Sequence, residues 1–332
     1  MGTYRFLLAI MVALSHMGVS VGGLNPGVFA VISFFLISGF VMTGLVRTHY
    51  AHWHAVPLFY LDRMARIFPQ YLLFLLLTAV ALGWLGLQSP YLAKFSAWAL
   101  MANVAVVPLD FFMFSDAIAR FMLIPQAWSL GLELLFYLLV PWLLLWRLRG
   151  VASLASLLIW GVAAFGVINT DTWGYRLLPG TLFMFLAGSY VYDQPRASWR
   201  HPAVWLGAVV LAISALLIVT DKHTLPYNRE VVSGLVAGIA VLFWLARLPR
   251  YAWDDWLGNL SYGVFLCHFL VMWLFEIISG PPTSATWSKG ALVVMLCCSV
   301  LLAWLGFKLV EKPVLRWRYQ FRQRELKQQP HG

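Results

Sequence analysis

The chain has 332 residues, of which 61% are hydrophobic and only 11% are charged. A soluble globular domain carries roughly 25% charged residues, so this composition excludes an ordinary soluble enzyme. The formal net charge of +10 does not indicate nucleic-acid binding, because the basic residues lie in short loops and in the tail. Membrane proteins use basic residues at such places to set their topology.

Apolar segments long enough to cross a membrane recur along the chain. A run of about 18 or more apolar residues is typical of a transmembrane helix, and lipid-exposed backbone must satisfy its own hydrogen bonds in helices or closed barrels. No segment alternates with a period of two, so we predict an all-α, polytopic membrane helical bundle of about ten transmembrane helices. The expected spans are 5–22, 28–46, 68–87, 128–147, 151–169, 176–192, 203–220, 229–246, 259–278 and 288–309.

The first segment, MGTYRFLLAIMVALSH, has a positive start and an apolar run, as a signal peptide does. The stretch GGLNP at 22–26 is typical of a turn and not of a cleavage site. We therefore expect this segment to stay as the first transmembrane helix.

The segment 91–127 lacks the continuous apolar pattern of a transmembrane span. Polar and helix-breaking residues interrupt it, namely Pro108, Asp110, Asp116, Arg120 and Pro125. With both termini in the cytoplasm and 91–125 omitted from the count, most of the 23 Lys and Arg residues lie on the cytoplasmic side, as the positive-inside rule requires. A single crossing by 91–125 would spoil this asymmetry, so we expect an outer-side or re-entrant element. The predicted organisation is one transmembrane domain, 1–312, followed by a basic cytoplasmic tail, 313–332.

Arg5 and His16 are the first candidate pair for a site. They lie eleven residues apart in an apolar segment, which is about 1100° of helical rotation and only about 20° from a whole number of turns. Both should therefore lie on one inward face. Ionisable groups inside membrane spans mark functional sites by default, although a neighbouring helix could simply hydrogen-bond this histidine.

The stretch WSLGLELLFY at 128–137 places Ser129 and Glu133 on one helical face. Glu133 could orient an imidazole, act as a base or bind a hydroxyl-bearing acceptor. Trp128 offers a flat apolar face of the kind on which sugars stack. The alternative is an interfacial aromatic residue beside an interfacial glutamate.

The stretch RMARIFP at 63–69 places Arg63 and Arg66 at the cytoplasmic start of a span. Positive-inside anchoring explains them without a site, whereas a phosphate clamp uses the bidentate hydrogen bonds of guanidinium. The preceding loop, HYAHWH at 49–54, lacks a Cys or acid to complete a metal site, and the three cysteines have no metal-ligand spacing, so we predict no metal.

Two further stretches carry polar residues inside spans. LGNLSYGVFLCH at 257–268 places Ser261 and His268 on one face, with His268 expected as a packing or hydrogen-bonding partner. SFFLISGF at 33–40 carries Ser38 and Gly39, small residues that allow close helix approach.

Six of these patterns occur in an order that resembles the acyltransferase 3 family of integral membrane acyltransferases. They are the basic residue and histidine at 5 and 16, GVFAVISFFLISGF at 27–40, Arg-x-x-Arg-Ile-x-Pro at 63–69, Trp-Ser-Leu-x-x-Glu-x-x-Phe-Tyr at 128–137, Leu-Ser-Tyr…His at 260–268 and Val-Glu-Lys-Pro at 310–313. Phe265 stands where the family often has Tyr.

The resemblance implies transfer of an acyl group, expected to be acetyl, from cytoplasmic acyl-coenzyme A to a hydroxyl of a carbohydrate or glycolipid acceptor. It implies that His16 is the essential histidine with Arg5 as its partner, and that Arg63 and Arg66 hold the acyl donor. Acyl-coenzyme A would be a substrate, with no permanently bound cofactor. The expected location is a bacterial cytoplasmic (inner) membrane, and a partner protein could complete the transfer.

A mechanism combines both lines of reasoning as a hypothesis. Arg63 and Arg66, with Arg47, hold the donor phosphates while His16 serves as base or nucleophile. Glu133 and the substrate-binding candidates approach with the acceptor. These candidates are Trp128, Ser129, Tyr137, Ser38 and His268.

Two other classes of protein fit parts of the sequence. A proton-coupled secondary transporter could use His16 and Glu133, but such carriers often show paired broken helices, and only 91–125 is irregular here. A haem protein could use His16 and His268 as axial ligands, which a Soret band would reveal.

Overall fold

The computed structural model describes residues 1–249, 251–282 and 286–317. Within these ranges the chain forms helices and loops, apart from one isolated β-bridge between Val21 and Leu24. Most of the expected tail, 313–332, lies outside the described residues.

A helix occupies the position of each expected span. The long helices are α1 (Gly2–His16), α2 (Pro26–His49), α3 (Val56–Leu85), α6 (Trp128–Leu145), α7 (Arg149–Ala164), α8 (Leu178–Asp193), α9 (Pro202–Val219), α10 (Asn228–Leu245), α11 (Ala252–Ser279) and α12 (Lys289–Gly306). The helical bundle is confirmed, but among the described residues 7 helices are long and apolar enough to cross a membrane. The count of about ten and the cytoplasmic placement of the termini stay predictions.

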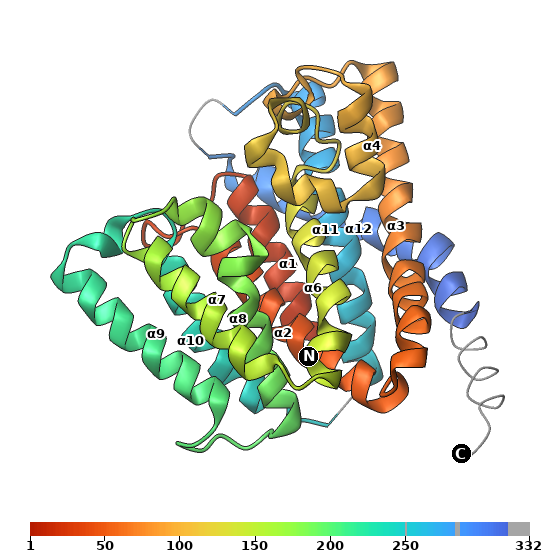
Figure 1. Ribbon diagram of the computed structural model, residues 1–332. Coiled ribbons are helices and arrows are strands. Elements are labelled where there is room, and N and C mark those ends of the chain that lie inside the picture. Colours follow the sequence, from red (N-terminus) through yellow and green to blue (C-terminus); the bar gives the residue numbers. More distant parts are fainter. Residues whose placement is uncertain (250, 283–285, 318–332) are drawn as a thin grey trace.

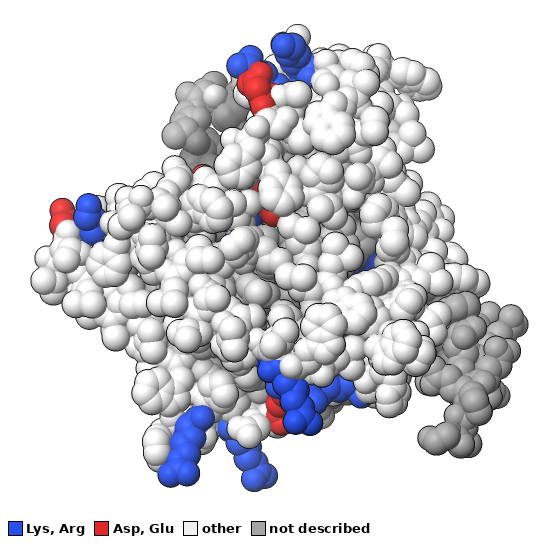
Figure 2. Space-filling model, in the orientation of Figure 1, with Lys and Arg blue, Asp and Glu red and all other residues white. Residues whose placement is uncertain are grey.

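The bundle has two groups of helices (Figure 1). In one, α1 packs against α11 and α2, and α11 packs against α12. In the other, α8 packs against α7, and α10 packs against α9. Contacts of α2 with both α8 and α10 join the two groups. Figure 2 shows Lys and Arg side chains gathered toward the ends of the helices, with a wide band that holds few charged side chains between them.

Close backbone contact joins α2 to α8. A Cβ atom on Gly39 would lie 1.7 Å from the carbonyl oxygen of Phe185, and one on Gly188 would lie 1.8 Å from that of Leu36. Only glycine permits this approach, in agreement with the expected role of Gly39 in helix packing. The neighbouring Ser38 donates a hydrogen bond to Glu133 of α6.

The start of α1 is fixed on α11. The Asp254 carboxylate accepts hydrogen bonds from the backbone N–H groups of Gly2 and Thr3, at 2.8 and 2.7 Å, and pairs with the terminal amine of Met1 at 2.7 Å. These contacts satisfy the free N–H groups at the start of a helix. At its other end α1 stops at His16, well before residue 22, because Gly18 and Gly22 take positive φ angles in the turn that follows.

The segment 91–127 forms short helices and contains no long membrane-spanning helix. They are η2 (Pro90–Leu92), α4 (Ala97–Ala105), η3 (Val107–Phe114), α5 (Asp116–Ala119) and η4 (Pro125–Ala127). Figure 1 shows this segment gathered beside the upper part of α3. The buried Asn103 holds it together: its side-chain amide donates to the carbonyls of Ala99 and Phe121 and accepts from Leu123 N–H, each at 2.8 Å.

Candidate functional site

Two adjoining cavities lie inside the group of helices built around α1, α2, α6 and α11. The first, the arginine cavity, has a volume of about 180 Å³ and the second, the histidine cavity, about 270 Å³. Val31, Ser129 and Phe265 line both, so these three side chains lie at the boundary between the two neighbouring cavities, which we call the junction.

The arginine cavity collects basic residues from two helices. Arg5 of α1 and Arg63 and Arg66 of α3 line it. Arg63 pairs with Asp62, and Arg66 pairs with Glu311 in the η7 turn (Phe307–Glu311) that follows α12. Glu311 belongs to the Val-Glu-Lys-Pro motif at 310–313, and the sequence alone predicts no role for this glutamate. An acid at the end of an apolar span, opposite an arginine pair, is the signal that could have revealed this contact.

Glu133 also lines the arginine cavity. The Ser38 hydroxyl and the Tyr137 hydroxyl both donate hydrogen bonds to its Oε1, each at 2.6 Å. Two donors of this kind suit a carboxylate, which accepts only. Glu133 was expected beside the acceptor with Trp128, but instead it shares a cavity with the arginines, and Ser38 and Tyr137 hold it there.

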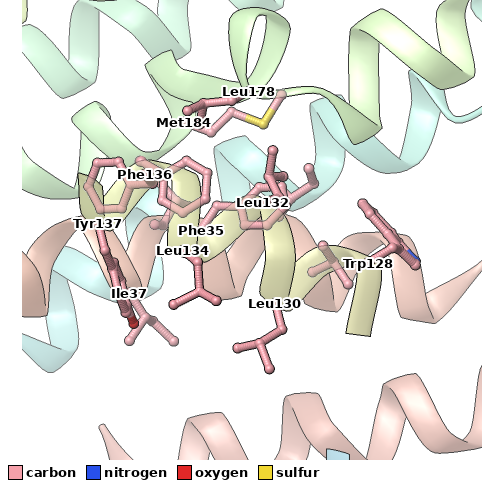
Figure 3. Close-up of a cluster of buried hydrophobic side chains, with 14 of the residues drawn as sticks. Phe35, Ile37, Trp128, Leu130, Leu132, Leu134, Phe136, Tyr137, Leu178 and Met184 are labelled. Carbon is pink, nitrogen blue, oxygen red and sulfur yellow. The ribbon is translucent and has the colours of Figure 1, made fainter. Parts of the chain in front are cut away.

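Different parts of α6 line the two cavities. Figure 3 shows Trp128 at one end and Tyr137 at the other, with Leu132, Phe136 and their neighbours packed between them. The helix therefore carries Trp128 toward the histidine cavity and Glu133 toward the arginine cavity.

His16 lines the histidine cavity at the end of α1. Its Nδ1 lies 2.9 Å from Nε2 of His268, and the two ring planes are within 5° of parallel with centroids 5.1 Å apart. His268 is completely buried, and its Nδ1 lies 3.2 Å from the carbonyl oxygen of Val264. The expected hydrogen-bonding role of His268 is thus seen, with His16 itself as the partner.

These contacts determine which nitrogen of His16 carries the proton. A backbone carbonyl only accepts, so His268 Nδ1 must be the donor to Val264. For a neutral ring, His268 Nε2 is then the acceptor, and His16 Nδ1 must donate to it. The lone pair of His16 is therefore on Nε2, where it is available to take a proton or to attack a carbonyl.

Sequence reasoning missed Arg176, which also lines the histidine cavity. It ends the π-helical turn Thr172–Arg176 before α8, and its guanidinium lies 4.7 Å from the ring centroid of Trp128. Trp128 is only 9% exposed, because Arg176 and Tyr175 pack against it. No spacing pattern in the sequence reveals this arrangement, because the aromatic partners of Arg176 come from distant segments.

Arg47 does not line either cavity. Its guanidinium pairs with Asp193 at 2.7 Å, and it lines a separate cavity with Arg147 and Arg149. A role for Arg47 in donor binding stays a prediction. Among the described residues, no group of three or more His, Cys, Asp or Glu side chains is placed to hold a metal ion.

Comparisons with known proteins identify the family of the chain. The chain is 33% identical over 205 residues to an uncharacterized protein of Aquifex aeolicus (strain VF5), a match that covers 59% of this chain and 90% of the relative. No solved structure matches the chain. The family described as "Acyltransferase domain" (Acyl_transf_3) matches residues 3–304, nearly the whole chain. The protein therefore belongs to this acyltransferase family, as an all-helical integral membrane member.

Proposed function

We propose that the protein transfers an acyl group, acetyl in the first instance, from acyl-coenzyme A to a carbohydrate hydroxyl. The observation that carries the proposal is the junction of the two cavities at Val31, Ser129 and Phe265. One cavity is lined by three arginines, which suits an anionic donor, and the other by His16, which suits activation of a hydroxyl.

The donor enters the arginine cavity. Arg63 and Arg66 bind phosphate oxygens of coenzyme A, since guanidinium binds phosphate through paired hydrogen bonds. The cavity volume of about 180 Å³ suits the thin pantetheine arm and not the nucleotide, which would stay at the mouth. The thioester then reaches the junction beside Ser129.

Glu133 limits the positive charge of this cavity. Its carboxylate shares the lining with Arg5, Arg63 and Arg66, and the hydrogen bonds from Ser38 and Tyr137 keep it in place. We assign Glu133 a role in positioning the donor and the arginines. Glu133 does not line the cavity that we assign to the acceptor.

The reaction takes place at the junction. Nε2 of His16 takes the proton of the acceptor hydroxyl, and the oxygen attacks the thioester carbonyl carbon. A C–O bond forms and the C–S bond breaks. The coenzyme A thiolate leaves and takes back the proton from His16, so protons and electrons balance without a further reactant.

The acceptor occupies the histidine cavity. This cavity is lined by His16 and by a mixture of aromatic and polar side chains that suits a sugar ring, namely Tyr175, Tyr227, Asn25 and Gln126. We propose the cytoplasmic membrane of a bacterium as the location, with surface polysaccharide or its lipid-linked precursor as the acceptor class.

The experiment is acyl transfer by purified protein in nanodiscs. Labelled acetyl-coenzyme A and a panel of sugar acceptors are supplied to wild type, His16→Ala and the control His223→Ala, whose histidine lies outside both cavities. His16→Ala should lose at least about a hundredfold in rate, the lower range for loss of a general base. Normal transfer by a well-folded His16→Ala protein would contradict the assignment.

A further inference from the structure

We propose that the acceptor carries an oxyanion, a carboxylate or a phosphate, beside the hydroxyl that is acylated, and that Arg176 binds this group. The inference rests on the proposed function, because it identifies the acceptor of that same site. It is carried by the surroundings of Arg176 in the histidine cavity.

Aromatic rings from three segments surround the Arg176 guanidinium. Its central carbon lies 5.3 Å from the ring centroid of Phe112, 4.7 Å from that of Trp128 and 6.0 Å from that of Tyr227. Tyr175, the preceding residue, contributes a fourth ring at 5.3 Å. Such contacts hold the planar guanidinium by cation–π attraction while its in-plane N–H groups stay available.

Only one edge of the guanidinium has a protein partner in the described part of the chain. Nε of Arg176 donates to Oδ1 of Asp171 at 2.8 Å. Arginine has five N–H donors, and this contact uses one of them. The side chain is only 15% exposed, so donors without partners would be costly unless a ligand or water accepts from them.

The charge of the histidine cavity favours an anion. Among the described residues that line it, Arg176 is the one with a permanent charge, and no Asp or Glu lines the cavity. Asp110 lies near Arg176, but burial raises the pKa of Asp110 to about 8, despite the opposing effect of Arg176. Burial therefore favours the uncharged form of this carboxyl, and the carboxylate that pairs with Arg176 is Asp171, which does not line the cavity.

Backbone strain at Tyr227 supports a ligand site. Tyr227 takes a φ of +64°, in the left-handed region that favours glycine, and its ring lies 5.1 Å from that of Tyr175. The buried side chain of Asn228 holds this conformation by donating to the carbonyls of Ala164 and Lys222, both at 2.9 Å. Strained residues that are fixed in this way cluster at ligand-binding sites.

Carboxylate and phosphate share the chemistry that this site would recognise. Each presents two oxygens in a plane that matches the paired N–H groups of guanidinium. A sugar with such a group would be held by Arg176, while one of its hydroxyls faces His16 in the same cavity. The acceptor class is therefore an acidic sugar, either a uronic-acid type or a sugar phosphate.

The test measures binding of three probes to the protein in nanodiscs of neutral lipid, without acetyl-coenzyme A. The probes are methyl glucuronide, glucose 1-phosphate and the neutral methyl glucoside. We expect wild type to bind at least one charged sugar tenfold or more tighter than methyl glucoside, and the tighter of the two identifies the source of the oxyanion. Equal binding of all three probes, or no binding of either charged sugar, would overturn the proposal.

Variants connect the preference to Arg176. Arg176→Gln should abolish the preference for a charged sugar over methyl glucoside. Arg176→Lys keeps the charge but loses the paired N–H groups, so it should reduce this preference. Arg149→Gln is a matched control, because Arg149 also stacks on a tyrosine and pairs with an aspartate, but at a different cavity. A preference that persists in a folded Arg176→Gln or is unchanged in Arg176→Lys would overturn the assignment.

The oxyanion-binding proposal and the transferase proposal can fail independently of each other. If a charged sugar binds through Arg176 but is never acylated, the transferase proposal fails and the binding site remains. If neutral sugars are acylated through His16 as readily as charged ones, the transferase proposal stands and the oxyanion site fails.

Discussion

His16 and His268 form a direct imidazole pair, with Nδ1 of the first 2.9 Å from Nε2 of the second and the ring planes within 5° of parallel. The Val264 carbonyl, 3.2 Å from the other nitrogen of His268, fixes the direction of proton donation along the pair. His268 is thus a positioning residue, because it acts on the reaction through the tautomer of His16.

Replacing His268 should separate this role from simple packing. His268→Leu removes the acceptor for His16 Nδ1–H, and we expect kcat to fall at least about tenfold with little change in the KM for acetyl-coenzyme A. His268→Gln keeps an acceptor oxygen at similar reach and should retain most of the activity. Equal losses in the two variants would show that His268 acts through packing alone.

The arginine pair on α3 should control donor affinity. Arg63→Gln together with Arg66→Gln removes two phosphate-binding guanidinium groups, so the KM for acetyl-coenzyme A should rise at least about tenfold. The change in kcat should be smaller. Arg120→Gln is the control, because Arg120 forms an exposed ion pair with Asp116 away from both cavities. An unchanged donor KM in the double variant would contradict the clamp.

The sequence predicts the helices well because each span must be apolar over its own length. It also predicts that Arg5 and His16 face inward, since helical periodicity is local. In the structure Arg5 lines the arginine cavity and His16 lines the histidine cavity. Helix ends are less accurate: α1 stops at His16 because glycines in the following turn take positive φ angles.

Contacts between distant segments could not be predicted from the sequence. Arg66 meets Glu311 and His16 meets His268 across more than 200 residues, and no spacing rule connects such positions. Glu133 was expected near the acceptor together with Trp128, which lies five residues before it. Five residues of α6 are enough to carry it into the other cavity, where Ser38 and Tyr137 bind it.

Gly39 should be intolerant of even the smallest side chain. Gly39→Ala places a methyl group where the Phe185 carbonyl oxygen lies, so α2 and α8 must separate, at a cost of about 1–3 kcal/mol. Thermal unfolding should therefore begin at a lower temperature, and transfer should weaken because Ser38 moves away from Glu133. Gly83→Ala is the matched control on α3, since nothing lies within 4 Å of the added atom. Equal stability of the two variants would show that this contact is not close in the protein.

Asp110 should make stability depend on pH. Both of its carboxylate oxygens are buried without a hydrogen-bond partner in the described structure, and burial raises its pKa to about 8 from an ordinary value of 3.8. Between these two values the folded protein binds more protons than the unfolded chain, so the free energy of unfolding falls as pH rises. The slope cannot exceed about 1.4 kcal/mol per pH unit for one group.

The measurement is thermal unfolding in nanodiscs between pH 5 and pH 8, in wild type and Asp110→Asn. Asparagine is neutral throughout this range, so stability should fall less with rising pH in Asp110→Asn than in wild type. Toward pH 8 the variant should therefore be the more stable protein. Asp116→Asn serves as the control, because Asp116 is exposed and its removal should leave the decline intact. If wild type and Asp110→Asn follow parallel curves, Asp110 is not held in its protonated form in the folded protein.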